Sequence, residues 1–341
     1  MTLDQAVALS LLDDRLPRLG LTARLACDDP RLLKLAAPLL AEAPRARGRA
    51  VASGIRVIAW NDPDFPPLLA AIADCPPVLW YRGSLAVLQV PTIAIVGSRA
   101  ATPVALETAA RLASDLAARG MTVVSGLARG VDSAAHRGAL EHGATVAVLG
   151  SGVDCIYPPE HKRLAERIVG AGLVVSEHPP GSAPLPHHFP LRNRLISGLS
   201  RAVVVIEASE KSGSLITAGC ALEQGREVMA VPGNVLSGRN RGGHALLRDG
   251  AKIVETADDI VEGLGWGSIG NGARAVEPGA SCEKGCVDPV LEAMEAGQSY
   301  DLDALATGSG LDAQRLLTRL IELELNGLVR REGGGRFVRS S

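Results

Sequence analysis

The sequence has 341 residues, enough for two or three domains, and its charges nearly balance, with 35 Lys and Arg against 37 Asp and Glu. The formal net charge of −2 excludes non-specific attraction of nucleic acid to the whole surface, so any nucleic-acid site must be a local basic patch. Aromatic residues make up only 3% of the chain, which predicts a core of Ala, Val, Leu and Ile. We expect a cytoplasmic protein that does not enter a membrane. There is no secretory signal, no apolar run long enough to span a bilayer, and the six cysteines are scattered.

Residues 1–50 are rich in Leu and Ala and are interrupted by prolines, which predicts short helices in a small helical domain. Residues 16–21 resemble part of a helix-hairpin-helix, but the second glycine of that motif is missing. Residues 54–60 alternate like a strand, and residues 77–83 form a second strand that ends in a turn. We place these two strands before the main sheet.

From Thr92 onward, short apolar runs alternate with longer helical patterns. The predicted strands cover residues 93–96, 121–124, 145–149, 173–175, 202–206 and 227–231, with an edge strand at 251–254. This alternation predicts an α/β fold, a Rossmann-like domain over residues 51–263 that has a parallel sheet with helices on both faces.

The C-terminal part follows a polar, glycine-rich linker at residues 264–285. Helices are predicted at 289–296, 302–306 and 312–325, followed by a β-hairpin at 328–339. Three helices and a hairpin make a winged-helix domain over residues 286–341. Its third helix carries two arginines against two glutamates, so contact with DNA and contact with protein both stay open.

The segment from Phe189 to Thr217 holds the densest group of candidate binding residues. Arg192, Asn193 and Arg194 lie on a short helix that we expect to begin after Pro190. The buried strand at 202–206 follows, and then Lys211, Ser212 and Gly213 precede the next helix. Free backbone N–H groups and a helix dipole, with cations beside them, indicate an anionic ligand.

Other predicted strands end in the same residue types. The glycines are Gly97, Gly126, Gly130, Gly150, Gly152 and Gly233, and the cations are Arg99, Arg129, Arg192, Arg194, Lys211, Arg239 and Arg241. Because ligands of open parallel sheets bind beyond the carboxyl ends of the strands, this edge is the candidate site.

Known cofactor signatures are missing from that edge. The loop after residue 96 lacks the later glycines of the dinucleotide fingerprint, and no P-loop occurs, so we expect no cofactor. A hydrolase is the main alternative, because Glu207 and Glu223 could face the cleft and one could act as a general base. Asp132 is expected to cap the helix after Gly130, and His136 lies one turn later. No catalytic triad or metal-ligand spacing is evident, so no metal is expected.

Seven stretches together resemble the DNA-processing protein A (DprA/Smf) family. They are IAIVGSR at 93–99, SGLARGVDSAAH at 125–136, AVLGSG at 147–152 with YP at 157–158, SE at 176–177, FPLRNRLISGLS at 189–200, SGSLIT at 212–217 and VPG at 231–233. They occur in family order across about half of the chain, which makes a chance resemblance improbable.

The resemblance implies a cytoplasmic, non-enzymatic homodimer that binds single-stranded DNA and loads RecA in natural transformation and recombination. The family's DNA pocket carries over to Arg99, Arg192, Asn193, Arg194 and Lys211, with Gly97 and Ser98 shaping a loop, and Lys162 matches a further basic contact more loosely. With Arg129, Ser212 and Gly213 from the strand-end pattern, these residues form the predicted DNA site. The alternative is a nucleotide-cleaving hydrolase on a related Rossmann-like fold.

Overall fold

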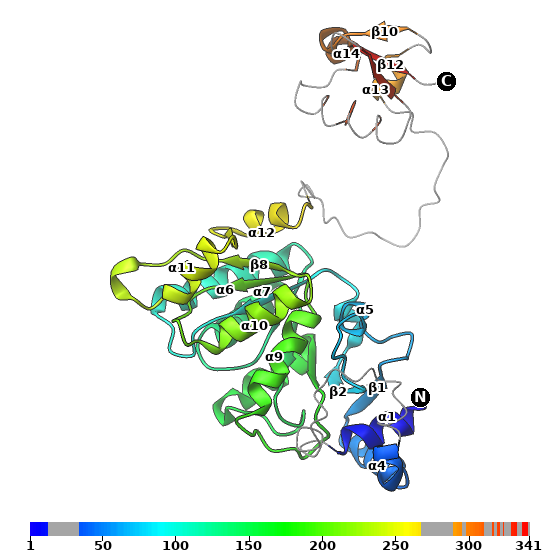
Figure 1. Ribbon diagram of the computed structural model, residues 1–341, viewed down its shortest axis with the longest axis vertical. Helices are drawn as coiled ribbons and strands as arrows, with labels where there is room; N and C mark the ends of the chain where they lie inside the picture. Colours follow the sequence, from blue (N-terminus) through cyan, green and yellow to red (C-terminus); the bar gives the residue numbers. More distant parts are fainter. Residues whose placement is uncertain are drawn as a thin grey trace. The chain divides into compact units, whose positions relative to one another are not determined.

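The computed structural model describes residues 1–12, 34–266, 289–294, 298–309, 329–332 and 336–339, together with residues 316, 319, 320 and 323 (Figure 1). The chain divides into two compact units, Met1–Ala273 and Arg274–Ser341. Among the described residues, no helix has both the length and the apolar character needed to cross a bilayer.

The larger unit is built on a nine-stranded sheet in the order β1-β2-β6-β5-β4-β3-β7-β8-β9. Its strands are β1 Arg56–Ala59, β2 Val78–Gly83, β3 Thr92–Val96, β4 Thr122–Ser125, β5 Thr145–Val148, β6 Leu173–Ser176, β7 Ala202–Val205, β8 Glu227–Ala230 and β9 Lys252–Ile253. The seven strands from β3 to β9 are parallel, while β2 pairs antiparallel with both β1 and β6. The predicted Rossmann-like α/β fold is therefore confirmed, and the two early strands extend one edge of the same sheet.

Helices cover both faces of this sheet. The helices that follow the strands are α6 Pro103–Ala118, α7 Val131–His142, α8 Lys162–Ala171, α9 His188–Gly198, α10 Gly213–Glu223, α11 Arg241–Arg248 and α12 Ala257–Gly263. Helix α9 begins at His188, so our prediction of a start after Pro190 was three residues late.

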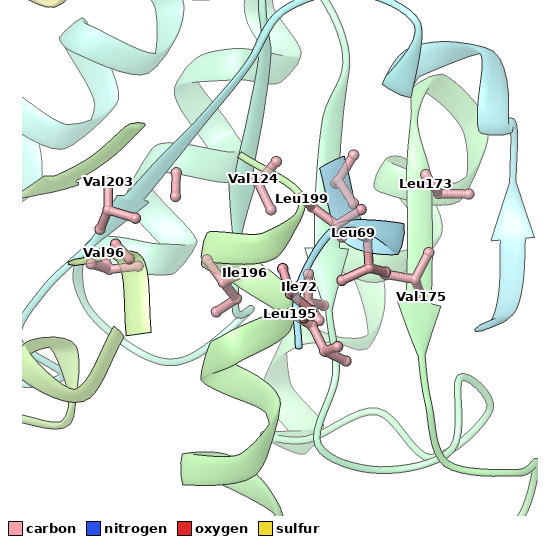
Figure 2. Close-up of a cluster of buried hydrophobic side chains, with 14 of the residues drawn as sticks. Leu69, Ile72, Val96, Val124, Leu173, Val175, Leu195, Ile196, Leu199 and Val203 are labelled. Carbon is pink, nitrogen blue, oxygen red and sulfur yellow. The ribbon is translucent and has the colours of Figure 1, made fainter. Parts of the chain in front are cut away.

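One face of the sheet is packed by α9, α10 and the short helix α5, Pro67–Ala70. Figure 2 shows Leu69 and Ile72 of the α5 region meeting Leu195 and Ile196 of α9 and Leu199, the C-cap residue that follows this helix. A Cβ on Gly198 would lie 2.9 Å from a methyl group of Leu69, so the glycine allows the two helices to approach closely. Burying each such Leu or Ile contributes about 1.5–3 kcal/mol. This packing fixes the helix that carries Arg192 and Asn193.

The opposite face is packed by α6, α7 and α8 and by the N-terminal helices α1 Leu3–Ser10 and α4 Ala43–Ala52. Val7 and Leu9 of α1 share a core with Trp80 of β2 and Ile168 of α8. The N-terminal helices therefore lie against the sheet beside β1 and β2 (Figure 1). The residues that suggested a helix-hairpin-helix lie outside the described part of the chain.

The smaller unit has the elements of a winged helix. They are α13 Pro289–Glu292, β10 Ser299–Tyr300, α14 Leu302–Ser309, β11 Val329–Glu332 and β12 Arg336–Arg339, with an antiparallel sheet in the order β10-β12-β11. Its core holds Val290, Leu305, Leu316, Leu320 and Phe337. Most of the helix predicted at 312–325 lies outside the described residues.

Candidate functional site

A cavity of the sheet unit lies at the topological switch point, where β3 has β4 on one side and β7 on the other. Helices leave opposite faces of the sheet at such a point, which opens a crevice beyond the carboxyl ends of the strands. The cavity has a volume of about 730 Å³. Its polar lining residues are Ser98, Arg99, Asp132, Tyr157, Arg192, Asn193, Ser209, Ser212, Ser214 and Thr217, with Gly97, Phe189, Gly213, Ile216, Pro184 and Pro186 among the others.

Two loops at the base of the pocket hold each other in place. The Val131 amide, at the start of α7, donates to the Ser98 carbonyl over 3.2 Å. Gly130 has a φ of +77°, and a Cβ there would lie 2.2 Å from the same carbonyl oxygen. Only glycine tolerates both the backbone conformation and this close approach. The loop after β3 is thereby fixed against the loop after β4.

A buried arginine, Arg192, lines the cavity. The Arg192 side chain reaches back under the loop after β4, and its Nη1 donates to the Val148 carbonyl over 2.6 Å. Arg192 is only 3% exposed, and burial lowers the pKa of its guanidinium to about 10 despite the attraction of Asp132. A Cβ on Gly126 would lie 1.9 Å from Nη1, so glycine leaves the space that the guanidinium occupies.

Asp132 organises the loop that precedes its helix. Its Oδ2 accepts hydrogen bonds from the amides of Gly126 and Ala128, at 3.1 and 3.3 Å. The prediction that Asp132 caps α7 was wrong, because Gly130 is the N-cap residue and no side chain bonds the cap. Burial raises the pKa of the Asp132 carboxyl, while the Arg192 guanidinium and the two amides oppose that rise.

Two histidines lie within hydrogen-bonding distance of the backbone of Leu127, a buried residue of the same loop with a φ of +57°. The Leu127 amide donates to His136 Nε2 over 3.3 Å, and the Leu127 carbonyl lies 2.9 Å from His161 Nδ1. Since Nε2 accepts, the proton of the neutral ring is on Nδ1, which lies 2.8 Å from Thr145 Oγ1. Burial lowers the pKa of His136 to about 3, so this residue is a neutral structural group rather than an accessible base.

Aromatic and cationic groups form one wall of the pocket. The Phe189 ring lies 5.5 Å from the Tyr157 ring, and the Arg99 guanidinium lies 5.5 Å from the Phe189 ring centroid. A small recess beside this wall is lined by Arg99, Arg129, Tyr157, Phe189 and Arg192. Arg129 also forms an exposed ion pair with Glu160 at 2.6 Å. This combination can stack a planar group and neutralise an anion at the same place.

The N-terminus of α10 also lines the cavity. Ser212 is its N-cap residue and accepts from the Ser214 amide, and Ser212, Gly213 and Ser214 all line the cavity. Asn193 Nδ2 donates to the Gly213 carbonyl over 3.1 Å, which ties α9 to the start of α10. The positive end of the helix dipole therefore reaches the pocket, as an anionic ligand requires.

The structure gathers most of the predicted site residues but not all of them. Gly97, Ser98, Arg99, Arg192, Asn193, Ser212 and Gly213 line the cavity, and Arg129 lines the recess beside it. Lys162 and Lys211 are exposed and line neither hollow. Arg194 is 8% exposed, also outside both linings, and pairs with Glu177 at 2.5 Å and with Asp74 at 3.0 Å.

The two glutamates of the hydrolase alternative do not line the cavity. Glu207 is buried, and its carboxylate accepts from the Thr102 hydroxyl over 2.8 Å and from the Thr102 amide over 3.3 Å. Glu223 is an exposed residue at the last turn of α10. The prediction that these groups could face the cleft was therefore wrong. Of the carboxylates in the described part of the chain, Asp132 alone lines the cavity.

Some lining residues were missed by the sequence reasoning. Pro184 and Pro186 come from the proline-rich connection between β6 and α9, and Ile216 comes from the first turn of α10. In the sequence, these residues could have been found only because they are next to the segments that already held candidate site residues. An apolar residue in a loop has no sequence pattern that indicates a function.

Comparison with known families decides the identity of this fold. The family model described as DNA recombination-mediator protein A matches residues 56–265, which include every strand of the sheet and the whole cavity. The chain belongs to the DNA recombination-mediator protein A family. The model of the DprA winged helix domain matches residues 284–335 of the smaller unit. The resemblance to this family in the sequence is thus confirmed.

Individual members of the family match over most of their length. The chain is 45% identical over 201 residues to the DNA processing protein DprA of Streptococcus pneumoniae, covering 59% of this chain and 71% of that protein. It is 40% identical over 281 residues to the protein Smf of Escherichia coli, covering 81% of this chain and 75% of that protein.

Solved structures agree with this assignment. The crystal structure of DprA from S. pneumoniae superposes with a TM-score of 0.63 at 35% identity, over 76% of this chain and 92% of the other. The structure of DNA processing protein A from Helicobacter pylori gives a TM-score of 0.56 at 29% identity, over 62% and 95%.

Proposed function

We propose that this chain binds single-stranded DNA in the switch-point cavity and acts in DNA processing during natural transformation and recombination. The observation that carries the proposal is one cavity lined both by Arg99, Phe189 and Tyr157 and by the N-terminus of α10. The H. pylori DNA processing protein A, whose solved structure is similar to this chain, is described as having a unique single-stranded DNA binding mode.

The chemistry of the wall favours a single strand over a duplex. The Tyr157 side chain is 40% exposed, and both rings line the cavity. In a duplex the faces of the bases are stacked on one another, whereas a single strand can offer a base to an aromatic side chain. Arg99 and the α10 amides can meanwhile bind the phosphates, which carry no sequence information. We therefore expect affinity for single strands with little sequence preference.

The same lining supports a non-enzymatic role. Asp132 lines the cavity, but its carboxylate is committed to two amides and to the Arg192 charge. These contacts support a structural role for Asp132 in the loop rather than a role as general base. The nucleotide-cleaving alternative is tested by incubating the protein with nucleoside monophosphates, where released base would contradict a pure binding role.

Three finer parts of the proposal concern partners and domains. We propose that the sheet unit binds DNA by itself, that two copies associate through this unit, and that the bound strand is handed to the recombinase RecA in the cytoplasm. The family description as a recombination mediator supports the last step. Lys162 and Lys211 are proposed as contacts outside the cavity, and Arg194 as a support for α9.

The decisive test compares a labelled oligothymidine with a duplex of equal length by fluorescence anisotropy. The parent protein should prefer the single strand, and Phe189→Ala should weaken that binding by about 5- to 150-fold, the value of about 1–3 kcal/mol for one stacked base. Leu191→Ala is the matched control, because Leu191 is an exposed residue of the same helix outside the cavity. Equal affinity for the duplex, or a Phe189→Ala protein that binds like the parent, would refute the proposal.

A further inference from the structure

A row of cations continues from the rim of the pocket along helix α8. Lys162, Arg163 and Arg167 are exposed on this helix, while Leu164 and Ile168 are buried against the sheet unit. Arg163 and Arg167 are four residues apart, so they lie on one side of the helix about 6 Å apart along its axis. We call these three side chains the α8 row.

The acidic side chains beside the α8 row already form ion pairs with other residues. Glu166 pairs with Arg82 of β2 through two hydrogen bonds of 2.8 and 3.0 Å, and Glu160 pairs with Arg129. Among the residues that the structure describes, no ion pair uses a side chain of the α8 row. No ion pair among the described residues therefore neutralises the charge of the row, although the chain as a whole carries a formal charge of −2.

The row is connected to the pocket by one hydrogen bond and by the course of the chain. Arg129 and Tyr157 line the recess beside the cavity, and Arg129 bonds Glu160, two residues before Lys162. Because α8 follows β5 and leads into β6, a parallel strand, the helix begins at the pocket edge of the sheet and runs back toward the opposite edge. On the α10 side of the pocket, by contrast, Lys211 is next to the exposed Glu210.

We infer that a DNA strand longer than the cavity leaves it past Arg129 and follows the α8 row, where Arg163 and Arg167 contact its phosphates. The inference rests on the proposed binding of single-stranded DNA in the cavity. It adds to the site a second segment that binds only through charge. This segment distinguishes no base and stacks on none. Only a strand long enough to leave the cavity can use it.

The test uses anisotropy with two labelled oligothymidines, one of about 5 nucleotides and one of about 20, a span that brackets common single-strand site sizes. The variant is Arg163→Ala/Arg167→Ala in the full chain. Each lost phosphate contact should make the salt dependence of the affinity shallower by about 0.7, so two contacts correspond to about 25-fold weaker binding at about 0.1 M salt. This loss is expected for the long strand, with affinity for the short strand unchanged.

Two further variants separate charge from structure. Arg163→Lys/Arg167→Lys keeps both charges and should bind the long strand within about two- to threefold of the parent, because phosphates are contacted through charge. Arg248→Ala removes an exposed arginine of α11 and should change neither affinity. Equal losses for both strands would overturn the inference, because the arginines would then act on the pocket. The inference would also be overturned if neither strand bound more weakly, because the α8 row would then be a contact site for an acidic protein partner instead. A parent that binds neither strand would instead refute the proposed function itself.

Discussion

Replacing Arg99 by alanine should weaken binding of single-stranded DNA without unfolding the protein. Arg99 is an exposed residue in the loop after β3, it lines both the cavity and the recess, and its guanidinium lies over the Phe189 ring. An exposed cation–π contact contributes about 0.5–1 kcal/mol, so the loss in the free energy of unfolding should stay near that value. The larger effect should be on the affinity for DNA.

The size of this effect follows from counterion release. If Arg99 neutralises one phosphate, the slope of log K against log salt should become shallower by about 0.7. At about 0.1 M salt this corresponds to about fivefold weaker binding, and the difference should disappear as the salt concentration approaches 1 M. Sequence preference should not change, because a phosphate contact carries no base identity.

The assay is a salt titration of a labelled oligothymidine by anisotropy, with the parent, Arg99→Ala and Arg248→Ala measured side by side. Thermal unfolding of each protein controls for folding. The reasoning fails if Arg99→Ala keeps the parental slope while it is folded, because the phosphates then do not pass this loop. It fails equally if Arg248→Ala changes the slope as much, because the effect would then come from net charge rather than from the site.

Two predictions concern stability. Arg194→Ala leaves Glu177 and Asp74 without their partner, so the free energy of unfolding in denaturant should fall by about 3 kcal/mol, and an unchanged value would show that the pair is dispensable. His136 has a folded pKa of about 3, below its unfolded value, so its stabilising contribution is present above about pH 6.5 and is lost as the pH falls. Between about pH 7 and pH 5 this loss is about 2 kcal/mol, and His136→Gln should show a pH dependence smaller by that amount.

The elements that make the site could largely be predicted from the sequence, because their signals are local. Apolar runs located the parallel strands, and glycines with cations at their ends located the edge where the cavity lies. Arg99 was correctly placed at the cavity because it directly follows β3. Such residues are positioned by the strand before them, so their place follows once the order of the strands is assumed.

The roles of charged side chains could not be predicted in the same way, because their partners are far away in the sequence. Arg192 and Arg194 are two residues apart on one helix, yet Arg192 lines the pocket and Arg194 pairs with Asp74 and Glu177. Asp132 has the position of a helix cap, but the path of the preceding loop brings the amides of Gly126 and Ala128 to its carboxylate. Only the assembled fold decides which partner a side chain meets.

The two ends of the large sheet limit how copies of this chain can associate. One end is β1, four residues long with the exposed Arg56 at its start, and the other is β9, only Lys252–Ile253. Short edge strands that carry cations are poor templates for a strand from another molecule. We therefore do not expect two protomers to join by continuing one sheet into the next. We expect the contact surface of the proposed dimer to come from helices or loops, which directs a search for interface mutations to those faces.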